Sequence, residues 1–235
     1  KPQQTIEGFG ACFNELGWPS LPALNQDGGD GNLRELFAPG VGANFTLCRM
    51  PLGANDFSRD WYSFDETPGD FALEHFSIAN DLETLVPFIR QALTYQPNLK
   101  LWASPWSPPT WMKTNQHYAA ALPNALTPGV SNGLRPDQVG KEGTDMFIQE
   151  DAYFRAYAAY FGRFIDEYRK LGINIGMVMP QNEFNSTQVF PSCTWTPQGL
   201  ARFIAQLGPE MAQRGVEVFF GTLEVEKKVT RNDEH

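Results

Sequence analysis

Residues 176–186 (GMVMPQNEFNS) place an amide and a carboxylate directly after a short apolar run. An apolar run bounded by glycine and proline is typical of a buried strand, so Asn182 and Glu183 stand where that strand is expected to end. A carboxylate at this position can serve as an acid or a base. Burial there is expected to raise the pKa of Glu183, so that it stays protonated near neutral pH.

Other polar and aromatic residues follow neighbouring apolar runs in the same way. Arg49 lies near the end of the run at 44–52, with Asp56 beyond it, and Trp106 follows the run at 99–104. In a parallel βα barrel the loops after the strands converge on one face, where active sites lie. We therefore expect these residues to meet. Neither GxGxxG nor GxxxxGKS/T occurs, so a nucleotide site in a doubly wound sheet is not indicated.

Carboxylates, an amide, an arginine and tryptophans, without a histidine or cysteine cluster, are the side chains with which proteins bind and cleave sugars. A tryptophan face packs against the apolar C–H face of a pyranose, while Asp and Asn bind its hydroxyls. Hydrolysing a glycoside requires one carboxylic acid to protonate the leaving oxygen and a second carboxylate across the ring, about 5 Å away in retaining enzymes. Glu183 fits the acid role.

Each of these residues also has a structural interpretation. An isolated Asn-Glu pair is a weak signal, because it occurs by chance about once in every few hundred positions. Arg49 can be a structural arginine paired with a strand-end carboxylate, and Asp56 can cap a loop. Trp102, inside the run at 99–104, is more typical of a core residue, whereas Trp106 is better placed to meet a substrate.

Composition argues against several other classes. The 235 residues are 42% hydrophobic and 13% aromatic, which suffices for a packed core. The net charge of -9 comes without a Lys/Arg cluster, so no nucleic-acid partner is expected. No stretch approaches the roughly 18 to 20 apolar residues of a membrane span. The chain starts at Lys1, which indicates a removed leader or a trimmed sequence, and we expect a secreted or periplasmic protein.

No metal or cofactor is expected. Cys12, Cys48 and Cys193 are widely spaced and form no CxxC pattern, and His75 and His117 lack the spacing of metal ligands.

Strand-like and helix-like segments alternate along the chain, which predicts a parallel sheet covered by helices. The strand candidates are residues 5–10, 44–52, 99–104, 175–179 and 216–223, and the helix candidates are residues 32–38, 81–93, 151–171 and 197–214. Thr196 is the expected N-cap of the last helix. We expect about five βα units of an α/β TIM (β/α)8 barrel. The long, aromatic-rich stretches at 53–80 and 105–150 are expected to be ordered binding loops.

Four motifs carry a resemblance to a known family. GFGACFNE at 8–15, RMPLGANDFS at 49–58, ASPWSPPTWMKTN at 103–115 and PQNEFNS at 180–186 resemble glycoside hydrolase family 30, which includes glucosylceramidases and β-1,6-glucanases. The motifs arrive in the family's order along the whole chain. The resemblance implies a (β/α)8 barrel with a side β-sandwich and retaining hydrolysis of β-glycosides without a cofactor.

The resemblance also implies roles for individual residues. Glu183 would be the acid/base and Asn182 would bind the sugar 2-hydroxyl. Asp56 and Trp106 would hold the sugar in the first subsite, and Arg49 would support the catalytic carboxylates.

One part of the family pattern is not found in residues 1–235. The family's nucleophilic glutamate follows a seventh strand, and the last strand expected here is the fifth. We therefore expect residues 1–235 to be the N-terminal part of a single catalytic barrel domain, with the last barrel strands and the side β-sandwich outside this chain. Glu15 and Glu224 are the nearest other carboxylates, and neither follows the right strand.

Three function classes stay open at this point. The first is a retaining β-glycosidase acting on a carbohydrate or glycolipid substrate, such as a glucosylceramide-like lipid or β-1,6-glucan. The second is a carbohydrate-binding protein on a catalytically incomplete barrel, and the third is a structural barrel fragment without activity. A glutamate at the end of a further strand would favour the first.

Overall fold

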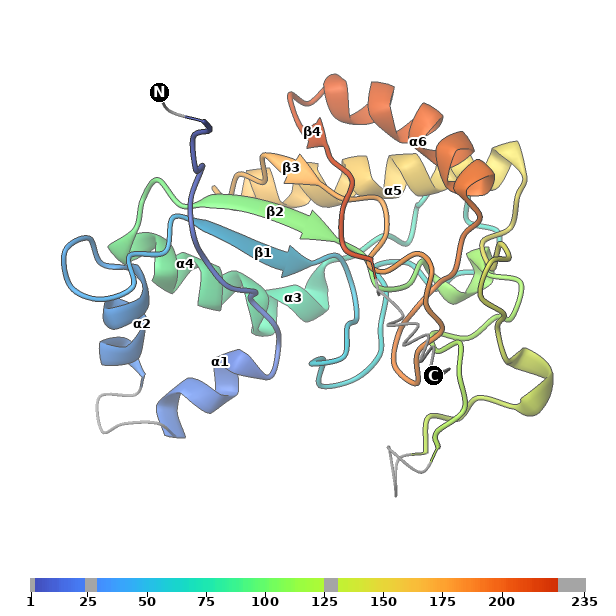
Figure 1. Ribbon diagram of the computed structural model, residues 1–235, viewed down its shortest axis with the longest axis horizontal. Coiled ribbons are helices and arrows are strands. Elements are labelled where there is room, and N and C mark those ends of the chain that lie inside the picture. The colour runs from blue at the N-terminus through green and yellow to red at the C-terminus, as the bar shows by residue number, and fades with distance from the viewer. Residues whose placement is uncertain (1–2, 24–28, 125–130, 224–235) are drawn as a thin grey trace, which may run out of the picture.

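A computed structural model describes residues 3–23, 29–124 and 131–223 of the chain (Figure 1). Within them, one parallel sheet runs in the order β1 (Leu47–Pro51), β2 (Lys100–Ser104), β3 (Met177–Val178) and β4 (Glu217–Val218). The spatial order equals the chain order, so these strands contain no switch point of the doubly wound kind. That is the arrangement of a barrel wall.

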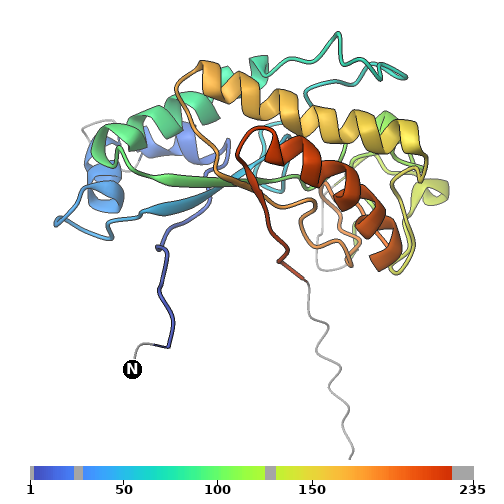
Figure 2. The same ribbon diagram turned by 90° about the horizontal axis from the view of Figure 1, so that it is seen from above.

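Helices cover one face of this sheet. Helices α4 (Leu85–Tyr95), α5 (Asp151–Lys170) and α6 (Pro197–Ala212) lie together on that side, as Figures 1 and 2 show. The remaining helices are short: α1 (Gly17–Ser20), α2 (Asp30–Phe37), α3 (Ala79–Glu83) and the 3-10 helices Leu21–Ala23, Thr110–Met112 and Pro136–Gln138.

The two faces of the sheet differ as strand alternation requires. Met50, Ala103 and Val178 point to the helices and are fully buried. Arg49 and Trp102 are opposite each other in the register of β1 and β2, point to the other face and are half-buried. In a (β/α)8 barrel this second face is the interior.

Several predicted elements are confirmed. The helix expected at 151–171 is α5, whose aromatic residues form a buried face, and the helix expected at 197–214 is α6. Thr196 is the N-cap of α6, because its hydroxyl oxygen accepts the N–H of Gly199 at 2.9 Å. The helix expected at 32–38 is α2, and the strands expected at 44–52 and 99–104 are β1 and β2 with shorter bounds.

The single helix expected at 81–93 is wrong, because α3 and α4 are separated at Thr84. Thr84 has φ -131° and ψ -68°, and its hydroxyl donates to Glu15. Pro87 explains why the break falls here. It stands in the first turn of α4, where its missing N–H costs nothing, but its ring would clash with the carbonyl of Glu83 in a continuous helix.

The strand expected at 5–10 is also wrong. The segment that pairs with β1 lies slightly further along the chain. The carbonyls of Phe9 and Ala11 accept backbone N–H groups of Leu47 and Arg49, respectively. Cys12 forms an isolated parallel bridge with Arg49. Gly10 permits this approach, since a Cβ there would lie 1.7 Å from the carbonyl oxygen of Leu47. The described sheet therefore has four strands and this segment, in place of five strands.

The strands expected at 175–179 and 216–223 contain only two residues each, β3 and β4. Pro180 has no N–H to continue the ladder, and Glu183 and Thr222 have φ of +43° and +47°. The chain therefore leaves the sheet at both places immediately before the residues of the site.

The two long loops are ordered in their described parts. Glu66 accepts hydrogen bonds from the backbone and hydroxyl of Thr110 and from Tyr118 at 2.7 Å, which joins the loop at 53–80 to the loop at 105–150. Lys113 is fully buried, and its ammonium donates to the carbonyls of Tyr118 and Ser192, each at 2.7 Å. Residues 125–130 of the second loop lie outside the described residues.

The close approach at Gly10 leads to a prediction. Gly10→Ala should lower the free energy of unfolding by about 2 kcal/mol or more, because the added methyl group meets backbone that cannot move aside cheaply. Gly208→Ala is the matched control: that helical glycine has open space around its Cβ position, so the substitution should stabilise by roughly 0.5–1 kcal/mol. Urea unfolding measures both, and equal effects would contradict the packing argument.

Candidate active site

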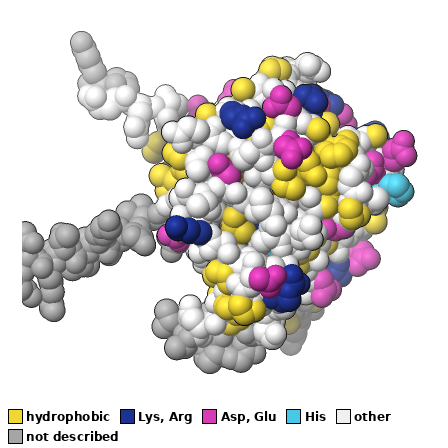
Figure 3. All heavy atoms as spheres, turned by 90° about the vertical axis from the view of Figure 1, so that its right-hand side faces the viewer, with side chains coloured by type: hydrophobic (Ala, Val, Ile, Leu, Met, Phe, Trp, Pro, Cys, Tyr) yellow, Lys and Arg dark blue, Asp and Glu magenta, His cyan; other side chains and the backbone are white. Residues whose placement is uncertain are grey.

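The carboxyl ends of β1, β2 and β3 meet at one edge of the sheet, where the two long loops begin. Pro51 and Ser104, the last residues of β1 and β2, are opposite each other in the register. Figure 3 views the side toward which β1 and β2 point, and shows acidic and basic side chains interspersed with exposed hydrophobic ones. The site is built at this edge.

Arg49 joins the ends of three strands. Its Nη2 donates to Asn182 Oδ1 at 2.6 Å and to Ser104 Oγ at 2.6 Å, and its Nε donates to Ser104 Oγ at 3.1 Å. The guanidinium carbon lies 4.1 Å from the ring centroid of Trp106 and 4.9 Å from that of Trp102. Stacking of this kind is favourable for a planar cation.

Arg49 interacts electrostatically with the two predicted site carboxylates, Asp56 and Glu183. Burial lowers the pKa of the Arg49 guanidinium from its ordinary value, and the nearby Cys12, Asp56 and Glu183 oppose that shift. The structure thus gathers Arg49, Asn182 and Trp106 by direct contact and brings Asp56 and Glu183 into the same electrostatic neighbourhood.

The backbone N–H groups of Asn182 and Glu183 both donate hydrogen bonds to neighbouring segments. Asn182 is 7% exposed, and its N–H donates to the carbonyl of Pro105 at 2.8 Å. Glu183 is half-buried, and its N–H donates to Thr222 Oγ1 at 3.3 Å. Because Arg49 donates to Asn182 Oδ1, the orientation of the amide is fixed, with Nδ2 as the remaining donor group.

Asp56 lies at the rim of the site and is exposed. The Asn55 side chain accepts the N–H of Phe57 at 2.7 Å and shapes the turn that carries Asp56. Partial desolvation raises the pKa of the Asp56 carboxyl, and attraction to Arg49 opposes the rise.

Both tryptophans near the end of β2 contact Arg49. Trp106 is 7% exposed, and Arg49 covers one face of its ring. Trp102 is half-buried on the inner face and packs edge-on against Phe219, with ring centroids 5.0 Å apart. Trp102 thus packs against Phe219 and Arg49 on the face of the sheet that is the interior of a (β/α)8 barrel, and its interpretation as a core residue stays a prediction.

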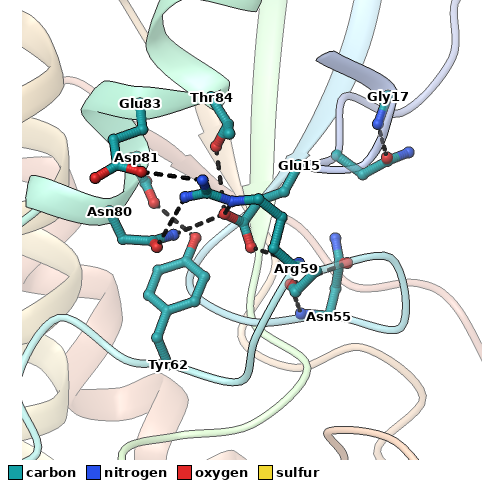
Figure 4. A network of polar contacts seen from close by, with 11 residues as sticks. Glu15, Gly17, Asn55, Arg59, Tyr62, Asn80, Asp81, Glu83 and Thr84 are labelled. Atoms are coloured by element: carbon teal, nitrogen blue, oxygen red, sulfur yellow. Dashed lines mark hydrogen bonds and ion pairs between the residues drawn. The ribbon is translucent and has the colours of Figure 1, made fainter. Parts of the chain in front are cut away.

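A second polar cluster, the Glu15 network, fixes the loop that carries Asp56. Glu15 is 1% exposed and accepts hydrogen bonds from the Arg59 guanidinium at 3.1 Å, from Asn80 at 2.8 Å and from Thr84 at 3.3 Å (Figure 4). Arg59 also pairs with Glu83 at 3.0 Å. With these partners the buried Glu15 anchors the loop at 53–80. Glu224 lies outside the described residues.

Asp81 lies beside this network and is fully buried. Its two carboxyl oxygens accept the hydroxyls of Tyr62 and Tyr168, each at 2.6 Å. Burial raises the pKa of Asp81 to about 7, although both hydrogen bonds lower it. The pair of tyrosines ties the loop at 53–80 to α5.

The described residues contain no group of three or more His, Cys, Asp or Glu side chains placed to hold a metal ion. His75 is paired with Asp70, its Nδ1 lying 2.9 Å from Asp70 Oδ2. No helix in the described ranges is both long and apolar enough to cross a membrane.

Arg49, Asn182 and Trp106 meet at the carboxyl edge of a parallel βα sheet, which is where TIM-barrel enzymes have their active sites. The model of the glycosyl hydrolase family 30 TIM-barrel domain matches residues 6–219. The chain therefore belongs to glycoside hydrolase family 30.

Its relatives include enzymes named for two substrates. The chain is 32% identical over 218 residues to putative glucosylceramidase 1 of Caenorhabditis elegans, covering 90% of this chain and 38% of the relative. It is 30% identical to the lysosomal acid glucosylceramidase of Mus musculus, covering 93% and 39%, and 30% identical to the endo-1,6-β-D-glucanase neg1 of Aspergillus fumigatus, covering 92% and 43%. The chain thus spans about two fifths of the length of these proteins.

Solved structures with a similar fold include two proteins that are each about twice as long as this chain. SrfJ from Salmonella typhimurium superimposes with a TM-score of 0.74 at 27% identity, over 92% of this chain and 44% of that one. The endo-β1,6-glucanase BT3312 has a TM-score of 0.73 at 25% identity, over 94% and 44%. The TIM-barrel fold class expected from the sequence is confirmed, with the chain matching part of each barrel protein.

Sequence reasoning missed several residues that organise the site. Ser104 accepts from Arg49, and the buried Gln181 contacts Trp106, Asn182 and Trp195. The available signal for Gln181 was a polar side chain between an apolar strand and the Asn-Glu pair. Nothing local indicated the Glu15 network, whose members are up to 69 residues apart.

Arg49→Lys should lower the free energy of unfolding by about 1–2 kcal/mol. A lysine keeps the charge but cannot bond Ser104 and Asn182 while stacking on Trp106. Arg202→Lys is the matched control, because Arg202 also stacks on a ring, that of Phe154, but is exposed, and its change should stay within about 0.5 kcal/mol. Urea unfolding of both variants checks this, and an equal loss would argue against a special role for the Arg49 contacts.

Asp81 should make stability depend on pH. Its folded pKa of about 7 is above the unfolded value of about 3.9, so the folded protein binds the proton more tightly and gains stability as the pH falls from 7 toward 4. Relative to Asp81→Asn, the wild-type free energy of unfolding should rise by at most about 1.4 kcal/mol for each unit by which the pH falls in this window.

Denaturant unfolding between pH 4.5 and 8 measures the difference between wild type and Asp81→Asn. Asp137→Asn is the control: Arg135 lowers the pKa of the exposed Asp137 carboxyl, so no such rise should appear above pH 5. A constant difference between wild type and Asp81→Asn would contradict the assignment.

Proposed function

We propose that this chain supplies the acid/base part of the active site of a retaining β-glycosidase that cleaves β-glucosidic bonds. The observation that carries the proposal is the Asn182-Glu183 pair in the segment after β3, with the Asn182 amide oriented by Arg49. Membership of glycoside hydrolase family 30 supports it.

Each site residue has a proposed role. Glu183 protonates the glycosidic oxygen as the bond breaks and later takes a proton from the attacking water. Asn182 donates its Nδ2 group to the sugar 2-hydroxyl, and Asp56 accepts from hydroxyls at the rim. Trp106 holds the sugar in the first subsite, and Arg49 supports the catalytic carboxylates.

The second carboxylate is proposed to come from sequence outside residues 1–235. Glu15 is 1% exposed and accepts hydrogen bonds from Arg59, Asn80 and Thr84, which supports a role as a loop anchor in place of a nucleophile. We take residues 1–235 as the N-terminal part of a single catalytic barrel domain, with the remaining strands and the side β-sandwich outside it. A glutamate after a later strand is the proposed nucleophile, and no cofactor takes part.

The substrate is proposed to be a glucosylceramide-like glycolipid or β-1,6-glucan, because the relatives carry names of both kinds. A secreted or periplasmic location fits either substrate. The alternative function is carbohydrate binding on a catalytically incomplete barrel, which predicts binding of β-glucosides without turnover.

Glu183→Gln tests the mechanism in the protein that carries the complete barrel. Turnover of β-glucosides with poor leaving groups should fall by a factor on the order of 100 or more, because the leaving oxygen then departs unprotonated. An activated aryl glucoside needs little protonation and should lose much less. Steady-state kinetics on the two substrates measure the difference.

Glu167→Gln on α5 is the control and should change neither rate by more than about twofold, because Glu167 pairs with Lys170 on the helix surface. An equal loss on both substrates in Glu183→Gln would count against the acid role. A wild-type protein that binds β-glucosides but hydrolyses none would favour the carbohydrate-binding alternative.

A further inference from the structure

Gln181 is a buried amide directly before the Asn-Glu pair. It is 2% exposed, and its Nε2 donates to the carbonyl of Trp106 at 2.8 Å and to the carbonyl of Asn182 at 2.9 Å. Its Oε1 accepts the indole N–H of Trp195 at 3.3 Å. One side chain therefore joins the chain after β2, the chain after β3 and the segment before α6.

The peptide group between Asn182 and Glu183 is held by side chains at both ends. Its carbonyl accepts from Gln181 Nε2, and its N–H donates to Thr222 Oγ1 at 3.3 Å. This peptide precedes a non-glycine residue with φ +43°. Such a conformation is unfavourable for an L-residue and persists only where the surroundings hold it.

We infer that Gln181 is a positioning residue for the acid/base, an inference that rests on the proposed function of Glu183. By fixing the plane of the Asn182-Glu183 peptide, Gln181 keeps Glu183 in its left-handed conformation, with its carboxyl in the neighbourhood of Arg49. Without that bond the peptide can rotate and φ can relax. The carboxyl then moves from the place where it must meet the glycosidic oxygen, and proton transfer is sensitive to such shifts.

The three hydrogen-bond partners at position 181 require an amide side chain. An amide supplies two N–H donors for two carbonyls and one acceptor for an indole N–H, which matches the three partners of Gln181. An ionised glutamate of the same shape has no donor and would face two carbonyl oxygens. A leucine of similar size would leave all three partners unpaired.

The test compares Gln181→Glu and Gln181→Leu with wild type in the protein that carries the complete barrel. On a β-glucoside with a poor leaving group, kcat should fall by roughly 10- to 100-fold while KM changes by less than about threefold. On an activated aryl glucoside the loss should be less than about threefold. A role in stability alone would lower the melting temperature without this dependence on the leaving group.

Gln138→Leu is the matched control. Gln138 is also buried, and its amide donates to the carbonyl of Asn115 at 2.8 Å and accepts the N–H of Arg135 at 3.1 Å. Its loss should cost stability and leave the ratio of the two rates unchanged. If neither Gln181 variant folds, Thr222→Val removes the bond at the other end of the same peptide and should show the same pattern more weakly.

Equal losses on both substrates in every variant that folds would overturn the inference. Glu183→Gln measured alongside separates this failure from failure of the proposed function. A leaving-group effect in Glu183→Gln but not in the Gln181 variants or in Thr222→Val would contradict only the positioning role of Gln181. The absence of a leaving-group effect in Glu183→Gln would contradict the acid role of Glu183.

Discussion

The guanidinium of Arg49 is the contact on which the site depends. It starts on β1, bonds Ser104 at the end of β2 and Asn182 beyond β3, and stacks on Trp106. A planar cation with several N–H donors can make these contacts together, whereas a point charge cannot. A buried guanidinium without partners would be costly, so the structure is most stable when Arg49 reaches both Ser104 and Asn182. The contacts that orient Asn182 therefore also fix the strand ends relative to one another.

The elements that were predicted correctly are those whose signals are local. The aromatic spacing of α5 and the Thr196 cap of α6 lie within a few residues of the structures they specify. The first strand was misplaced because its position depends on how closely Gly10 approaches Leu47, which the sequence near Gly10 does not encode. The break at Thr84 likewise combines a local cause, Pro87, with a distant partner, Glu15.

The candidate site was predictable in its residue types and less so in its arrangement. Polar residues after apolar runs, with the family resemblance, identified Arg49, Asn182 and Glu183. The stacking of Arg49 on both tryptophans was not predictable, because it depends on how β1 and β2 pair. Supporting residues such as Gln181 carry no chemistry of their own, so only their contacts across strands show what they do.

The chain leaves the regular sheet soon after β3 and β4. A peptide in the sheet ladder uses its N–H and carbonyl for neighbouring strands and directs its side chains along a fixed alternation. Glu183 and Thr222 instead have positive φ, which takes their backbone out of the ladder and aims their side chains differently. Gln181 and Thr222 then provide the hydrogen bonds that the ladder would have supplied. The sheet thus gives up regular pairing before Asn182 and Glu183, and the side chains of Gln181 and Thr222 supply hydrogen bonds to the peptide between them.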